Sequence, residues 1–83
     1  MEKLEKIKEK ADVRVSGVVF SGYGHKKVNF EITVGFEYKI FSVVTSSMPL
    51  IDEYNDTGDD DVLINSSIFP SDAITEWLST LEK

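Results

Sequence analysis

The densest group of chemically active side chains is DEYNDTGDDD, residues 52–61, in which six of ten residues are acidic and Gly58 is the only glycine. Clustered carboxylates can bind calcium, attract a basic partner or simply solvate a turn. An EF-hand calcium loop has its invariant glycine at position 6, which would place position 1 at Glu53 and position 12 at Ile64. Position 1 should be Asp and position 12 a bidentate Glu. The spacing therefore predicts no calcium site and leaves only weak ion binding open.

The other side chains that could do chemistry are few. His25 is the only histidine and there is no cysteine, so a transition-metal site would need carboxylates around His25. A Ser-His-Asp triad is not expected, because no G-x-S-x-G motif is present. SGYGHK, residues 21–26, contains Gly22 and Gly24 but no third glycine and no Walker Lys-Ser/Thr, so it predicts a hairpin turn with Tyr23 and His25 at its tip. We expect no cofactor, no metal and no enzymatic activity, since so short a chain rarely encloses a cleft of about 300 Å³.

Charge is distributed unevenly along the chain. Residues 1–41 contain eight Lys/Arg and six Asp/Glu, whereas residues 42–83 contain nine Asp/Glu and a single Lys, Lys83. The net charge of −6 therefore comes from the second half. Such a surface repels nucleic acid and anionic membranes and attracts basic surfaces. Direct binding to nucleic acid is not expected, because neutralising phosphates requires Lys and Arg.

Length and composition predict one small domain, residues 1–83. Hydrophobic residues make up 41% and charged residues 29%, as is usual for a globular protein. The absence of cysteine excludes disulfides and favours a reducing compartment. The start, MEKLEKIKEK, lacks the apolar region of a secretory signal, and no apolar run approaches the roughly 18 residues of a membrane helix. We therefore expect a cytoplasmic protein without membrane contact.

The hydrophobic pattern predicts a small α+β domain, with an antiparallel sheet of three or four strands and helices at both ends of the chain packed on it. Helices are expected over residues 2–11, over 49–55 with Gly58 as its end, and from a capping Ser71 onward. Strands are expected over 12–20, with a bulge at Gly17, over 28–34 and 36–45, and as a short edge strand at 61–64.

The connection around Gly35 decides which side chains of the third strand face the core. A two-residue Gly35-Phe36 turn suits a type II′ hairpin but pairs Ile32 with Lys39, which mixes charge into the apolar face. A three-residue loop that includes Glu37 pairs Ile32 with Ile40 and keeps that face apolar. We expect the three-residue loop or an equivalent bulge. Phe41 and Val43 would then lie on the opposite face, either covered by the first helix and loops or exposed to a partner.

In size, acidity and element order the chain resembles small phage-encoded inhibitors, such as anti-CRISPR proteins that block the DNA site of a nuclease. The segments that carry the resemblance are the leading helix EKLEKIKEK, the sheet VNFEITVGFEYKIFSVV and, after the acidic run, the closing helix SDAITEWLSTLEK. This outline covers most of the chain, and it implies a role in viral anti-defence without assigning a function to any single residue.

Charge and resemblance together favour a non-enzymatic binding protein that engages a basic protein surface, in its strongest form an inhibitor that occupies the nucleic-acid-binding groove of a protein such as a nuclease. The acids predicted to contact the partner are Asp52, Glu53, Asp56, Asp59, Asp60 and Asp61, with Asp72 and Glu76 as further acids that could lie near them. The predicted apolar contacts are Tyr23, Tyr54 and Phe41. The alternative is a structural or assembly protein that forms homo-oligomers through its sheet.

Overall fold

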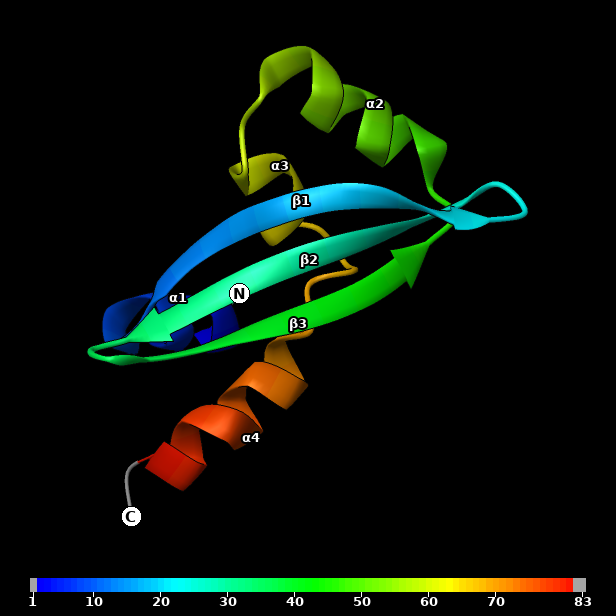
Figure 1. The fold of residues 1–83 in the computed structure, drawn as a ribbon. Helices are drawn as coiled ribbons and strands as arrows, with labels where there is room; N and C mark the ends of the chain where they lie inside the picture. The colour runs from blue at the N-terminus through cyan, green and yellow to red at the C-terminus, as the bar shows by residue number, and fades with distance from the viewer. Residues whose placement is uncertain (1, 82–83) are drawn as a thin grey trace.

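The computed structural model describes residues 2–81 and has the element order α-β-β-β-α-α-α (Figure 1). Helix α1 (Glu2–Lys10) precedes the strands β1 (Asp12–Gly22), β2 (His25–Val34) and β3 (Glu37–Thr45). Helices α2 (Met48–Thr57), α3 (Asp61–Ile64) and α4 (Ser71–Leu81) follow. The predicted α+β class, with a three-stranded antiparallel sheet and helices towards both ends of the chain, is confirmed.

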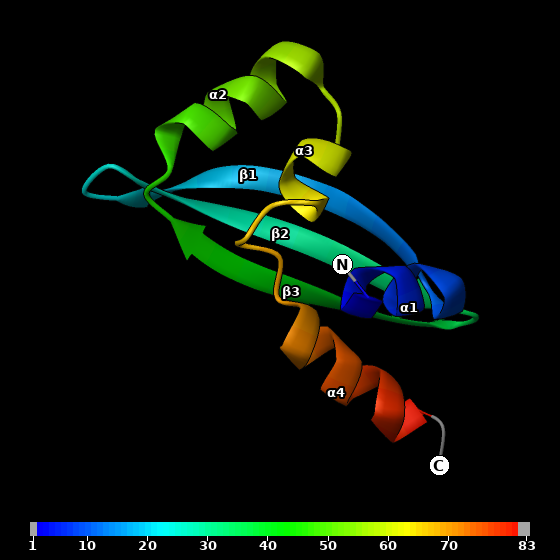
Figure 2. The same cartoon turned by 180° about the vertical axis from the view of Figure 1, so that it is seen from behind.

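The sheet is a meander in the order β1-β2-β3, and the helices pack on one of its faces (Figures 1 and 2). The central strand β2 directs Val28, Phe30 and Ile32 into the core, where all three are fully buried. Every helix adds apolar side chains to the same cluster, which also includes Ala11 and Phe69. The remaining buried members are Leu4, Ile7, Ile51, Leu63, Ile64, Ile74 and Leu78. One continuous core therefore holds the sheet and all four helices together.

The register between β2 and β3 differs from the expected one. Gly35 and Phe36 form a two-residue turn, and Ile32 pairs with Lys39 rather than with Ile40. Gly35 has a φ of 60° while Phe36 does not have a positive φ, which is the combination that a type II′ turn requires. The prediction of a three-residue loop was therefore wrong. Because a one-residue change of register exchanges the two faces, Phe41 and Val43 lie on the helix-covered face and the even-numbered residues of β3 lie on the open face.

Residues 61–64 form the short helix α3 and not the predicted edge strand. The carboxylate of Asp60, immediately before α3, accepts a hydrogen bond from the backbone N–H of Val15 at 3.0 Å. Val15 belongs to β1, whose outer edge would otherwise expose that N–H. A side chain and a helix thus cover the outer edge of β1.

The other elements follow the sequence pattern closely. The bulge predicted at Gly17 is present as a register shift between Val15 and Gly17. Helix α2 begins at Met48-Pro49 and ends at Gly58, whose left-handed conformation (φ 67°) lets its N–H bond to the carbonyl of Tyr54. Helix α4 begins at Ser71 itself, so the serine predicted as the cap is the first helical residue.

Candidate functional site

Helix α2 concentrates acidic side chains on its outer face. Ile51 is buried, while Asp52, Glu53 and Asp56 are exposed. Asp52 and Asp56 are four residues apart and Glu53 and Asp56 three apart, so the three carboxylates share the helix face that points away from the core. None of them takes part in an ion pair within the described part of the chain. This face therefore has unneutralised negative charge.

The connection from α2 to α3 and the start of α3 add three more acids, and each of these also has a structural partner. Asp59 accepts a hydrogen bond from the backbone N–H of Asp61 at 3.0 Å, and Asp60 accepts the N–H of Val15. Asp61 lies 3.8 Å from the ammonium of Lys8, an exposed contact between α3 and α1. These carboxylates therefore shape the connection in addition to charging it.

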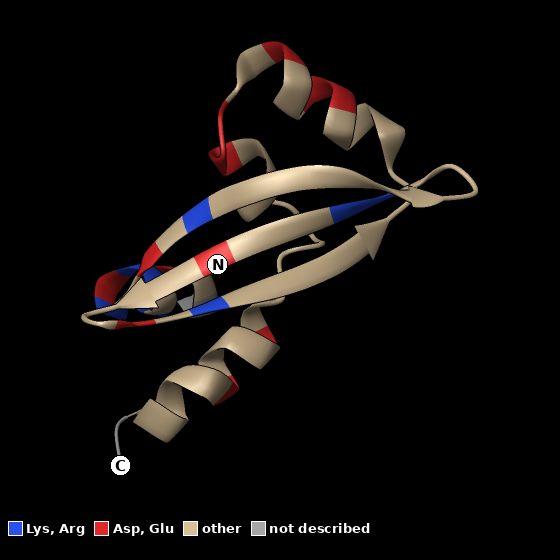
Figure 3. Ribbon diagram, in the orientation of Figure 1, with Lys and Arg blue, Asp and Glu red and all other residues tan. Residues whose placement is uncertain are grey.

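Figure 3 shows the acidic positions of α2, of the connection and of α3 following one another on the same side of the molecule, beyond the β1 edge of the sheet. We call this set, Asp52, Glu53, Asp56, Asp59, Asp60 and Asp61, the acidic surface. The acidic positions of α4, which are Asp72 and Glu76, lie across the width of the sheet from α2 (Figure 3). The six acids of residues 52–61 are thus brought together, whereas the two acids of α4 are not part of the group.

The three predicted apolar contacts lie in different environments. Tyr54 is on the inner side of α2, half-buried against the core. Phe41 faces the helices and packs edge-on against Trp77, with ring centroids 5.9 Å apart, so its expected place on the face opposite the core was wrong. Tyr23 is fully exposed at the tip of the β1–β2 hairpin, as predicted.

Tyr23 has an unusual backbone conformation. Its φ is 50°, in the left-handed region that residues other than glycine, asparagine and aspartate seldom adopt. His25 Nδ1 lies 3.1 Å from the carbonyl oxygen of Tyr23 and donates to it when Nδ1 carries the proton. Lys26 pairs with Thr45, which lies three residues before α2 begins, so the hairpin tip and the start of α2 are at the same end of the sheet. A strained, exposed aromatic residue therefore stands at the end of the sheet where the acidic helix begins.

The apolar side chains exposed on the open face of the sheet were not predicted from the sequence. Tyr38, Ile40 and Val44 of β3 are exposed there, by 67%, 39% and 55%. The glycine at position 35 was the available signal, because the type II′ turn that it favours places these residues outside. The three-residue loop was expected in its place because the type II′ register pairs Ile32 with Lys39 and so puts a charge on the apolar face.

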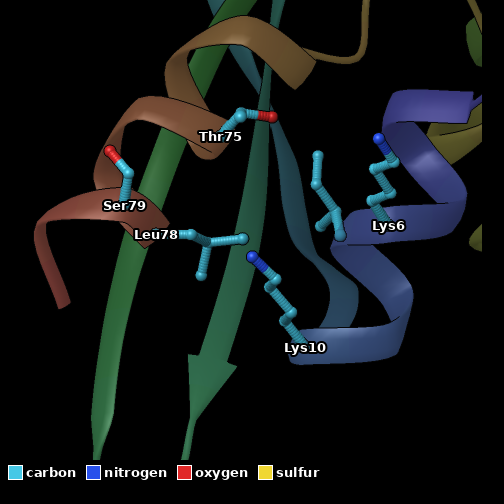
Figure 4. A pocket seen from close by; sticks show the side chains of 6 residues that line it. Lys6, Lys10, Thr75, Leu78 and Ser79 are labelled. Atoms are coloured by element: carbon cyan, nitrogen blue, oxygen red, sulfur yellow. The ribbon is translucent and has the colours of Figure 1, made fainter. Parts of the chain in front are cut away.

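A cavity of about 270 Å³ lies between α1 and α4 and is lined by Lys6, Ile7, Lys10, Thr75, Leu78 and Ser79 (Figure 4). Its polar groups are already engaged in part, because the Ser79 hydroxyl donates to the carbonyl of Glu76 and Lys10 takes part in another interaction. No acid–base pair lines the cavity. Within residues 2–81, no three Asp, Glu or His side chains converge closely enough to hold a metal ion.

Comparison of the chain with models of protein families, with curated proteins and with solved structures found no match. None of the helices described within residues 2–81 combines the length and the apolar character needed to cross a lipid bilayer. The geometry and charge of the acidic surface are therefore the features that bear on function.

Proposed function

We propose that the protein is a non-enzymatic binding module whose acidic surface docks on a basic surface of a partner protein. The observation that carries the proposal is the gathering of all six acids of residues 52–61 on one side of the molecule, beyond the β1 edge. The sequence has no Lys or Arg between residues 42 and 82, so the segment that forms this surface contains no cation of its own. Like charges held this close repel one another, and a cationic partner removes that penalty.

The spacing of the charges suits a partner that normally binds nucleic acid. Asp52, Glu53 and Asp56 fall within about 6 Å of helix rise, which is about one charge per 2–3 Å. Duplex DNA carries one phosphate charge per roughly 1.7 Å of its axis. A groove lined with Lys and Arg therefore meets a similar density of negative charge on α2, and the protein is proposed to inhibit such a partner by occupying that groove. This is the mode of action implied by the resemblance to phage-encoded inhibitors of nucleases.

Tyr23 supplies the apolar part of the proposed interface. Charged rims mainly accelerate and orient association, whereas buried aromatic side chains contribute most of the affinity. Tyr23 is fully exposed and stands at the end of the sheet where α2 begins. It can enter a pocket of the partner while the acids of α2 contact the basic rim.

The experiment compares two double variants with the same change of net charge. Asp52→Lys with Asp56→Lys reverses the acidic face of α2, and Glu5→Lys with Glu9→Lys makes the same change at the same helical spacing on the exposed side of α1. Both are tested as competitors of labelled DNA or RNA bound to a panel of nucleases and other nucleic-acid-binding proteins. The wild type and the α1 variant should displace the nucleic acid from the same panel member, and the α2 variant should fail to do so.

Salt provides the second readout for any panel member that is bound. Affinity should fall steeply as ionic strength rises, because exposed charges more than about 10 Å apart are screened at 0.1 M salt. A partner that binds the wild type and the α2 variant equally well, with no dependence on salt, would contradict the proposal. Equal loss of binding by both double variants would show that binding depends on the net charge of the protein and not on the acidic surface in particular.

A further inference from the structure

The two edges of the sheet are protected very differently. At the β1 edge, the carboxylate of Asp60 binds the N–H of Val15, a bulge interrupts the strand at Gly17, and α3 lies alongside. These are the devices by which proteins keep an edge strand from pairing with another chain. At the edge of β3, no bulge interrupts the strand and no side chain within residues 2–81 binds an outward N–H group.

The turn at Gly35-Phe36 determines which backbone groups of β3 point outward. Residues that flank a two-residue hairpin loop form a hydrogen-bonded pair, and hydrogen-bonded pairs then alternate along the ladder. Val34 pairs with Glu37, so the odd-numbered residues of β3 bond to β2. The N–H and C=O groups that point to the outer edge belong to Tyr38, Ile40, Ser42 and Val44. No hydrogen bond within residues 2–81 uses these backbone groups.

The side chains around the same edge are also incompletely covered. Tyr38, Ile40 and Val44 are exposed on the open face of the sheet. On the covered face, a cavity of about 330 Å³ lies between β3 and α4, and its lining includes the rings of Phe41 and Trp77. Apolar surface thus remains accessible on both sides of the unpaired outer edge of β3. The strand contains neither proline nor glycine.

We infer that β3 pairs with β3 of a second copy of this chain, in antiparallel orientation about a two-fold axis at Phe41, to form a continuous six-stranded sheet. Only another strand offers donors and acceptors at the spacing of the outward groups of β3. The register centred on Phe41 pairs all nine residues of the strand with the second copy. It also uses all four outward residues. Tyr38 of each copy pairs with Val44 of the other, and Ile40 of each copy pairs with Ser42 of the other.

The charges of β3 favour a second copy as the occupant. In this register Lys39 lies opposite Val43 and Glu37 lies opposite Thr45, so no like charges face each other. Each Tyr38 packs beside a Val44 of the other copy, an aromatic–β-branched pair of the kind that stabilises sheets. The inference does not depend on the acidic surface, which is built on α2 and the connection to α3.

Disulfide trapping tests the register directly, because the chain contains no cysteine. A mixture of Tyr38→Cys and Val44→Cys chains places the two thiols opposite each other, about 5.5 Å apart between Cα atoms, within the range of a disulfide. The control mixture combines Phe36→Cys with Tyr38→Cys, two exposed positions that the antiparallel register separates by more than about 20 Å. The first mixture should form its heterodisulfide at least about tenfold faster, since pairing holds the thiols at a millimolar effective concentration.

Sedimentation equilibrium tests the pairing itself. The unmodified chain should show a concentration-dependent species of about twice the 9.4 kDa of one chain. A synthetic chain with N-methyl groups on Ile40 and Ser42 loses two outward N–H groups without losing a bond to β2, and it should remain monomeric with an unchanged circular dichroism spectrum. An unmodified chain that stays monomeric at all concentrations overturns the inference. So does a dimer that persists after methylation, or equal trapping in the two cysteine mixtures.

Discussion

Carboxylates of the same acidic run have different roles in this protein. The side chain of Asp60 is half-buried and holds the β1 edge through the N–H of Val15, whereas Asp56 is exposed and without a hydrogen bond or ion pair within the described residues. Asp60 therefore stabilises the fold, whereas Asp56 contributes only surface charge. One substitution at each position distinguishes these two roles.

Asp60→Ala should destabilise the protein by about 1–3 kcal/mol, because it leaves a partly buried N–H without an acceptor. Asp60→Asn should lose less, since the amide oxygen still accepts the bond. Asp56→Ala is the matched control and should change the free energy of unfolding by less than about 0.5 kcal/mol. Urea unfolding followed by circular dichroism measures all three, and equal effects of Asp60→Ala and Asp56→Ala would contradict the structural role of Asp60.

Tyr23→Asn should stabilise the fold by about 0.5–1 kcal/mol, because asparagine tolerates the left-handed conformation that strains tyrosine. The same substitution should weaken binding to a partner captured through the acidic surface, if Tyr23 is its apolar contact. Thermal unfolding and a binding titration give the two values. Lower stability of the asparagine variant would show that the tyrosine ring has a structural contact that outweighs its backbone strain.

At the scale of elements, the turn between β2 and β3 has the largest consequence. The type II′ geometry at Gly35 places Phe41 against Trp77 and leaves Tyr38, Ile40 and Val44 on the open face. Lys39 is compatible with the covered face because its side chain stays exposed beside α4, with its ammonium 5.3 Å from the centre of the Phe41 ring. A charge in the apolar register is thus tolerated where the side chain remains in contact with solvent.

Gly35→Ala should therefore destabilise the protein by about 1–2 kcal/mol, because a side chain is strained at a positive φ. Phe36→Ala, at the fully exposed second turn position, should change stability by less than about 0.5 kcal/mol. Chemical denaturation measures both, and cross-strand nuclear Overhauser contacts between Ile32 and Lys39 check the register. Contacts between Ile32 and Ile40 in their place would contradict the two-residue turn.

At the scale of the whole molecule, one apolar cluster joins all the helices and strands. The acidic charge and the protection of the sheet edges, in contrast, are distributed unevenly between the two edges of the sheet. The acidic surface lies towards the β1 edge, and the unpaired backbone groups lie at the β3 edge (Figures 1 and 3). Two independent interfaces, one for a basic partner and one for a second copy, can thus coexist without competing for the same residues.

A single core predicts a single cooperative unfolding transition, in which far-ultraviolet circular dichroism and the fluorescence of Trp77 change together. Ile7→Ala on α1 should lower the free energy of unfolding by about 3 kcal/mol and shift both signals equally, because Ile7 is almost fully buried between α1 and the rest of the core. Lys8→Ala, which removes only an exposed ion pair, is the control. Transitions that separate would mean that α1 and α4 unfold independently of each other.

The sequence alone determined helices α1, α2 and α4, the three long strands, the bulge at Gly17 and the end of α2 at Gly58. Each of these depends on local periodicity or on the conformational preference of one residue. It also determined that six acids follow one another on a segment without cations, which restricts the chemistry of the partner wherever that segment lies.

Only the tertiary structure decided the register of β3 and the conformation of residues 61–64. Both faces of β3 are apolar enough to be buried, so the choice depended on the turn at Gly35 and on the presence of Trp77 above Phe41. The short segment after Asp60 could pair as a strand or coil as a helix, and a long-range hydrogen bond to Val15 accompanies the helix. Gly35 is a local signal for the turn, but the contacts of Phe41 with Trp77 and of Val15 with Asp60 join residues far apart in the chain, and local periodicity does not encode them.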